Sequence, residues 1–365
     1  MDRLVRNPDL LISWSEGDLS VQECRSGKTL SVSPETILLL DSFGAPRTPS
    51  AAAASLPDYD RPSVLRSIGR LRRLGLLIPE REGRRRVSRV KEWKQNLASV
   101  QYHLATRDIP YLTTPAAVDR FLQGRLAAER PRPRFKRYRG AKGRRRLAAD
   151  AAGPGPEKAR VLGEVLAARR TIREFSRQRV RLEDLAAIVR GTWGRSGWFD
   201  GGEFGRFPLK TSPSAGCLHP IECYVLAWNV SGLPAGLYHY DVASDELRRL
   251  RSGDLRASAV KAASGQRWVG RAGFLCVMTA VFERTLWKYQ IESAYRVLWI
   301  EAGHLAQTFC LLATSRGLGP FTTAAIQDTF VERLIGLDGV KEFPVYLCGA
   351  GIPARPSSGA RGTPF

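Results

Sequence analysis

An ammonium group and a phenol stand next to each other at Lys288 and Tyr289, shortly after a strand-like segment that ends near Phe282. At the edge of a buried pocket such a pair can transfer a proton, provided that burial or the neighbouring charge lowers one of the two pKa values from about 10. A surface lysine beside an interfacial tyrosine is the alternative. The pair by itself does not decide between the two.

Basic side chains around one hydroxyl group indicate an anion site. Arg169, Arg170, Thr171 and Arg173 follow directly on a helical segment. Guanidinium groups offer forked donors to phosphate oxygens, and a threonine hydroxyl adds one more. In so basic a chain a solvated helix end is the alternative, and for this segment alone we favour that alternative.

Small residues between two prolines form a third candidate segment, residues 212–220, which read SPSAGCLHP. Such a backbone can approach a flat ligand closely, and its amides and serine hydroxyl can bond to ring heteroatoms. An ordinary turn explains the segment equally well. We expect His219, within it, to be structural. The residues of interest here are Pro213, Ser214, Ala215 and Gly216.

A fourth segment, residues 316–323, closes the longest predicted helix with the sequence RGLGPFTT. A glycine is common just past a helix end, so Gly317 is explained as a cap. The run from Gly319 to Thr323 is not explained in this way. It could offer amides and hydroxyls to a ligand.

The elements that would position these segments follow from the apolar periodicity. The longest helix is predicted over 289–316, where apolar residues recur at alternating steps of three and four. Such a helix is either the middle of a core or half of a dimer interface. The other predicted helices are 157–169, 182–194 and 254–264, and the predicted strands are 222–228, 236–241, 273–282 and 344–349.

Residues 1–80 form a separate pattern. A hairpin over 10–14 and 19–23 precedes two helices, which begin near Ser33 and Arg61, and a short strand over 76–78 follows. This order is typical of a winged helix. An abrupt change comes at 130–146, where RPRPRFKRYRGAKGRRR cannot fold against its own charge. We therefore predict an N-terminal domain over 1–128, a basic linker over 129–156 and a main domain over 157–356.

Composition excludes several classes of protein. The chain has 365 residues and a net charge of +22; residues 1–150 hold 30 basic and 16 acidic residues, against 27 and 19 in the rest. The basic excess suggests an acidic partner, while no apolar run is long enough to span a bilayer. Six scattered cysteines and the lack of a signal-peptide pattern favour the cytoplasm, and four scattered histidines argue against a metal site. Neither a phosphate-binding P-loop nor a Rossmann glycine motif is present.

Taken in order, the four segments resemble the nitroreductase-like flavin fold, specifically its SagB-type azoline dehydrogenase branch. The resemblance spans about 160–355, and the order of the segments is more specific than any one of them. It implies an α+β fold with an antiparallel-rich sheet flanked by helices, dimeric and binding FMN, preceded by a small winged-helix-like domain. The segments are RRTIREF, TSPSAGCLHPIECY, WKY with YRVLWIEAGHLAQTFCLLATSRGLGPF, and VYLCGAGIP.

The resemblance also implies roles for individual residues. Lys288 and Tyr289 match the catalytic pair of the family, and residues 213–216 would lie along the isoalloxazine ring. The FMN phosphate would be held by Arg169, Thr171 and Arg173, with Arg170 beside them. The rest of the pocket would be formed by Gly317, Gly319, Thr323 and Arg355. Two positions depart from the family pattern: Thr171 stands where serine is common, and Cys217 where a small apolar residue is usual.

Members of this branch oxidise thiazoline or oxazoline rings in modified peptides to thiazoles or oxazoles, with molecular oxygen as the final acceptor. The resemblance therefore implies an azoline-containing precursor peptide as substrate, with a cyclodehydratase complex and a second copy of the chain as partners. An NAD(P)H-dependent nitroreductase-like flavin reductase is the first alternative. An inactive peptide- or nucleic-acid-binding scaffold is the second. The N-terminal domain resembles peptide-leader-binding modules, with a DNA-reading module as its alternative.

Overall fold

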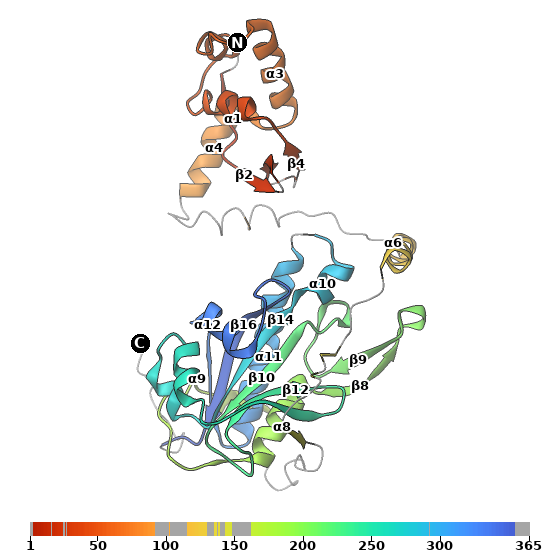
Figure 1. Cartoon of the computed structure of the whole chain (residues 1–365), viewed down its shortest axis with the longest axis vertical. Coiled ribbons are helices and arrows are strands. Elements are labelled where there is room, and N and C mark those ends of the chain that lie inside the picture. The colour runs from red at the N-terminus through yellow and green to blue at the C-terminus, as the bar shows by residue number, and fades with distance from the viewer. Residues whose placement is uncertain are drawn as a thin grey trace. The chain divides into compact units, whose positions relative to one another are not determined.

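The computed structural model describes residues 3–15, 17–24, 26, 28–91, 102, 115–129, 135–136, 138, 143–147, 162–291 and 293–354. The chain divides into two compact units, Met1–Tyr111 and Leu112–Phe365 (Figure 1). Arg355, one of the predicted cofactor residues, lies outside the described residues, as does the start of the predicted helix 157–169.

The N-terminal unit combines a three-stranded antiparallel sheet with helices. Its strands are β2 (Leu10–Ser15), β3 (Asp18–Glu23) and β4 (Lys28–Ser31), in the order β2-β3-β4. Its helices are α1 (Pro34–Asp41), α2 (Pro49–Ala54), α3 (Arg61–Arg73) and α4 (Glu80–Lys91), and β1 (Leu4–Arg6) pairs with β5 (Leu77–Pro79). The carboxylate of Asp60 accepts from the Ser63 N–H and so caps α3. The predicted hairpin, both predicted helices and the short strand are all present.

The second unit is built on one seven-stranded sheet in which every neighbouring pair is antiparallel, in agreement with the antiparallel-rich sheet that the resemblance implies. The strand order is β15-β16-β14-β10-β12-β13-β6. The strands are β6 (Arg144–Arg146), β10 (Ile221–Ala227), β12 (Gly236–Asp241), β13 (Glu246–Ser252), β14 (Phe274–Val281), β15 (Gly319–Thr323) and β16 (Glu342–Gly351).

Helices cover both faces of this sheet (Figure 1). Because successive side chains point to opposite faces, Cys223 and Val225 of β10 pack against α8 (Leu182–Trp193) and α11 (Ala294–Ser315). Leu226 points the other way, toward the face covered by α9 (Arg256–Ala262), η3 (Arg267–Arg271) and α12 (Asp328–Ile335). The result is the α+β arrangement of sheet and flanking helices that the sequence predicts.

The predicted start of the longest helix is wrong. Residue Lys288 ends a short helix, α10 (Phe282–Lys288), and Tyr289 leaves it with extended φ and ψ angles of −111° and 91°. The long helix α11 begins only at Ala294, whose N–H donates to the Ile291 carbonyl at 2.9 Å. By length and composition α11 could cross a membrane, and half of its most apolar 18-residue window is buried inside the structure.

Several connecting elements were not predicted. A hairpin of β8 (Arg195–Asp200) and β9 (Arg206–Lys210) leads into the 212–220 segment. Strands β6, β13 and β15 of the large sheet were not predicted either, nor were β7 (Val180–Arg181), β11 (Val230–Ser231), η1 (Gly202–Phe204) and η2 (Ala215–Cys217). Helices α6 (Pro115–Ala128) and α7 (Leu162–Ala168) lie where the sequence predicts helices, near 114–125 and within 157–169.

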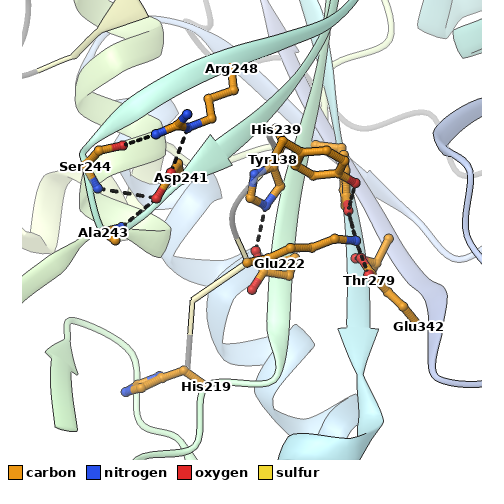
Figure 2. Close-up of polar contacts among 12 residues, drawn as sticks. Tyr138, His219, Glu222, His239, Asp241, Ala243, Ser244, Arg248, Thr279 and Glu342 are labelled. Atoms are coloured by element: carbon orange, nitrogen blue, oxygen red, sulfur yellow. Dashed lines mark hydrogen bonds and ion pairs between the residues drawn. The ribbon is translucent and has the colours of Figure 1, made fainter. Parts of the chain in front are cut away.

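Parts of the predicted N-terminal domain and linker contribute to the second unit. Helix α6 contacts it through Arg125, whose Nε donates to the Trp287 carbonyl at 3.1 Å. From the linker, β6 is the edge strand of the large sheet, and Lys136 donates to Tyr224 Oη at 2.7 Å and to the Glu342 carboxylate. Figure 2 shows Tyr138 beside His239 and Glu342 beside Thr279 in this cluster.

Candidate functional site

The candidate catalytic pair lies at the C-terminal end of α10, the short helix that follows β14. Lys288 and Tyr289 are both half-buried, and the Lys288 Nζ atom lies 5.7 Å from the centre of the Tyr289 ring. The Tyr289 N–H donates to the Thr285 carbonyl at 2.9 Å, which ties it to the last turn of α10. The two side chains are therefore held together at one corner of the sheet.

The 212–220 segment folds directly against this pair. Gly216 lies in the η2 turn with a φ of +61°, a conformation that favours glycine. A Cβ atom at Gly216 would lie 3.0 Å from Tyr289 Oη and 3.1 Å from Lys288 Nζ. The structure thus brings together two segments that lie about seventy residues apart in the sequence, and only a residue without a side chain fits between them.

Buried hydrogen bonds hold this turn at both ends. The Ser214 hydroxyl donates to Glu301 Oε2 at 2.5 Å and accepts from the His219 N–H at 2.9 Å. Arg284 Nη1 donates to the His219 carbonyl at 3.0 Å, and His219 Nε2 lies 3.0 Å from the Pro208 carbonyl. Because its proton points to Glu301, the Ser214 hydroxyl does not offer that proton to a ligand, contrary to one use foreseen for it.

The ionisable groups around the turn respond to burial. Burial raises the pKa of Glu301 to about 7 and lowers that of Lys210, at the end of β9, to about 8. Burial, together with the charge of Lys210, lowers the pKa of His219 to about 3, so the imidazole is neutral and structural, as the sequence predicts. Burial also raises the pKa of Tyr289, whose phenol therefore keeps its proton at neutral pH.

A buried ion pair continues the network under the turn. Arg284 Nη1 lies 2.6 Å from Glu222 Oε1, and His239 Nε2 lies 2.7 Å from Glu222 Oε2, a contact visible in Figure 2. Burial by itself would raise the pKa of Glu222, but the Arg284 guanidinium and the His239 hydrogen bond outweigh it and hold the pKa well below its usual range.

Sequence reasoning missed Glu301 and Arg284. A signal for Glu301 was present, since it is the sole acidic residue of α11 and lies three residues after Leu298 and four before Leu305, within the apolar stripe. A carboxylate in such a stripe is buried only when something pairs with it. Arg284 has no comparable signal, because α10 is too short to show a periodicity.

The predicted anion segment lies against the 316–323 segment. The Ile172 N–H donates to the Pro320 carbonyl at 2.9 Å, and a Cβ atom at Gly319 would lie 2.7 Å from the Cβ of Ile172. Arg170, Gly317 and Gly319 line one small pocket together with Pro353. These two predicted segments therefore form one cluster, in which Gly319 must be a glycine.

The arginines of this cluster carry uncompensated charge. In the part of the chain that the structure describes, no carboxylate lies within ion-pair distance of Arg169, Arg170 or Arg173. Arg170 Nη1 donates to the carbonyls of Ala167 and Arg169, and the Arg173 guanidinium lies 5.6 Å from the centre of the Trp268 ring. A cluster of this kind suits a phosphate.

The remaining predicted residues are the two threonines, Thr171 and Thr323. The Thr323 hydroxyl accepts from Gln266 Nε2 at 3.2 Å and from the Ala325 N–H at 3.1 Å. Exposed Thr171 lies within the arginine cluster. Among the described residues, no group of three or more His, Cys, Asp or Glu side chains is placed to hold a metal ion.

Comparison with known proteins decides the family. The sequence pattern of the nitroreductase family matches residues 166–352, which is just over half of the chain. The chain belongs to the nitroreductase family. Its membership makes it an oxidoreductase and confirms both the resemblance drawn from the sequence motifs and the nitroreductase-like fold.

Relatives of this family member come from archaea and bacteria. The chain is 30% identical over 190 residues to a Methanocaldococcus jannaschii protein named as a nitroreductase, covering 52% of the chain and 90% of that protein. It is 26% identical over 321 residues to a trifolitoxin operon protein of Rhizobium leguminosarum, covering 83% and 85%. The microcin B17-processing protein of Escherichia coli is 31% identical over 132 residues, covering 34% of the chain and 48% of that protein.

A solved structure agrees on the fold. A nitroreductase from Anabaena variabilis superposes with a TM-score of 0.51 at 22% identity, covering 68% of this chain and 49% of that chain. At this identity the likeness concerns the fold alone.

Proposed function

We propose that this nitroreductase-family member is an FMN-dependent dehydrogenase that oxidises thiazoline or oxazoline rings of a precursor peptide to thiazoles or oxazoles. The observation that carries the proposal is the contact of Gly216 with Lys288 and Tyr289, because it places a proton-transfer pair against a turn suited to a flat ring. Support comes from relatives whose names tie them to trifolitoxin and to microcin B17 processing.

The residues present fit FMN. The guanidinium groups of Arg169 and Arg173, which no described carboxylate neutralises, suit a phosphate, and Arg170 lines the adjoining pocket with Gly317 and Gly319. When bound, FMN supplies the acceptor for a hydride. We expect Arg169→Ala to weaken FMN binding about tenfold, while the exposed Arg66→Ala in α3 leaves it unchanged.

The two clusters favour a cofactor shared between two copies of the chain. Glu301, which holds the Ser214 turn, precedes Gly317 by sixteen residues, which is about 24 Å along a straight helix. The arginine cluster of one protomer would bind the FMN phosphate, while the turn that contains Gly216 in its partner would contact the isoalloxazine ring. On α11, Trp299 and Ile300 are exposed, at 43% and 51%, and offer an apolar surface for such a homodimer.

Aromatising an azoline removes a hydride from one ring carbon and a proton from its neighbour. We assign the proton transfer to the pair formed by Lys288 and Tyr289. Because burial raises the pKa of Tyr289, its phenol is a hydrogen-bond donor at neutral pH. Because Gly216 has no side chain, Lys288 and Tyr289 can both lie against the turn that we expect to contact the flavin ring.

The N-terminal unit would bind the leader of the precursor peptide. Strand β4 is an edge of its sheet, and a cavity of about 510 Å³ lies between β4, α1 and α3, beside the exposed side chains of Leu38 and Tyr59. An extended peptide can add to such an edge as a further strand, and the basic excess of residues 1–150 favours an acidic one. Leu38→Glu should raise KM for the full precursor and leave it unchanged for a short azoline peptide.

The test of the function is a mass spectrum of an azoline-bearing peptide before and after incubation with the FMN-loaded protein. Loss of two hydrogens per ring supports the proposal. An unchanged mass, with rapid bleaching of the flavin by NADPH under anaerobic conditions, contradicts it and supports an NAD(P)H-dependent nitroreductase-like flavin reductase instead.

A cyclodehydratase is the expected partner of this enzyme. All six cysteines are free thiols, which suits a cytoplasmic enzyme.

A further inference from the structure

One buried carboxyl group has no role in the proposed chemistry. The Glu301 side chain is 3% exposed and lies among the apolar residues of α11. Burying a carboxyl group without good partners is costly, and an apolar residue would pack the stripe better. Something other than stability therefore accounts for an acid at this position.

The contacts of Glu301 lead to the turn that carries Gly216. Its Oε2 accepts from the Ser214 hydroxyl at 2.5 Å, and the same hydroxyl accepts from the His219 N–H at 2.9 Å. One serine oxygen thus joins the first residue of the turn to the last, and Glu301 fixes the direction in which that hydroxyl points.

A second buried charge, Arg284, also holds this turn. Arg284, which is 4% exposed, donates to the His219 carbonyl at 3.0 Å and is itself paired with Glu222. It lies one helical turn before Lys288 in α10, so the helix that carries Lys288 also holds the turn. The position of the turn is therefore coupled to the position of the catalytic pair.

The backbone of the turn needs this support. Cys217 and His219 have φ angles of +54° and +44°, a region that residues with a side chain rarely adopt. Such a conformation is strained and persists only where the surroundings impose it. The hydrogen bonds of Ser214 and Arg284 impose it here.

We propose that Glu301 is a positioning residue: through the Ser214 hydroxyl it fixes the turn that sets Gly216, and any flat ring lying on it, against Lys288 and Tyr289. The proposal rests on the proposed function only for the identity of the ring. It predicts that removing the carboxyl group loosens the turn, while an amide oxygen in the same place still accepts from Ser214.

The test compares Glu301→Leu, Glu301→Gln and Ser214→Ala with Glu183→Leu, a matched control at an exposed glutamate of α8. FMN affinity is measured by quenching of flavin fluorescence on titration with apoprotein. Because one hydrogen bond to a charged group is lost, we expect Glu301→Leu and Ser214→Ala to bind FMN about ten- to hundredfold more weakly. Glu301→Gln and the control should stay within about threefold of the unchanged protein.

A double-variant cycle separates positioning from general packing. If Glu301 acts through Ser214, the variant with both Glu301→Leu and Ser214→Ala loses no more affinity than either single variant. In turnover of an azoline peptide, kcat should fall while KM stays constant, since the leader binds elsewhere.

Two results would overturn the inference: FMN affinity of Glu301→Leu within twofold of the unchanged protein, or losses that add in the double variant. Should Glu301→Leu fail to fold, Ser214→Ala and Glu301→Gln decide by themselves. Should the unchanged protein bind FMN but leave azolines intact, the affinity results still test Glu301, and only the proposed function fails.

Discussion

Gly216 lies so close to Lys288 that one added methyl group would come within 3.1 Å of the lysine ammonium nitrogen. The same methyl group would lie 3.0 Å from the Tyr289 hydroxyl. Both distances are shorter than Cβ contacts normally are. A residue larger than glycine at position 216 would therefore displace the side chains of Lys288 and Tyr289.

We expect Gly216→Ala to displace the pair and to reduce turnover by about ten- to hundredfold, since misplacement by about 1 Å has effects of this size. Its φ of +61° adds roughly 1 kcal/mol of strain. Steady-state kinetics and a thermal melt measure the two effects. Gly69→Ala is the matched control, because Gly69 lies within α3 with open space around it. Full activity of Gly216→Ala would contradict the contact.

Removing either member of the pair should separate binding from chemistry. We expect Lys288→Ala and Tyr289→Phe to retain bound FMN while turnover falls about a hundredfold or more, as for the loss of a general acid or base. The flavin absorbance of the purified variants and their single-turnover rates provide the measurement. If both variants turn over normally, the assignment of the pair is wrong.

Glu301 should make stability depend on pH. Its pKa is raised from 4.5 to about 7, so its contribution is fully present below pH 4.5 and is lost as the pH rises toward 7. The contribution of Lys210 to stability changes only at higher pH, because its pKa is lowered to about 8. The groups that face Glu301 are Ser214, Lys210, His219, Arg284 and the Ile221 N–H.

Glutamine at position 301 removes this dependence. The free energy of unfolding of Glu301→Gln, taken relative to that of the unchanged protein, should rise by on the order of 2 kcal/mol between pH 4.5 and pH 7. Thermal melts of both proteins at several pH values measure this difference, in which the other titrating groups cancel. A constant difference across the range would show that Glu301 titrates normally.

Two glycines of the phosphate cluster should respond differently to alanine. At Gly319 the added Cβ would lie 2.7 Å from Ile172, so we expect Gly319→Ala to cost about 1–3 kcal/mol through overpacking. Gly317 has open space but a φ of +73°, so Gly317→Ala should cost only about 1 kcal/mol. Melting temperatures rank the two variants, and the reverse order would contradict the packing of Ile172 against Gly319.

Much of the site could be predicted from neighbouring residues alone. Lys288 and Tyr289 are adjacent in the chain, and Arg169, Arg170 and Arg173 share one short segment. Local patterns of this kind do not depend on the tertiary structure, and they sufficed for the family and for strands β10, β12, β14 and β16 of the large sheet. The assignment of domain boundaries and of the FMN-binding residues stays a prediction.

The contacts that select among those residues could not be predicted, because they join parts of the chain that only the packed sheet and helices bring together. Ser214 meets Glu301 across 87 residues, and His219 meets Arg284 across 65. The late start of α11 was not predictable either, because the apolar spacing runs on from Tyr289, whereas Tyr289 itself has an extended backbone and the helix begins at Ala294. The sequence by itself determined which groups can do chemistry; burial and long-range hydrogen bonding in the tertiary structure decided which of them face one another and in which protonation state.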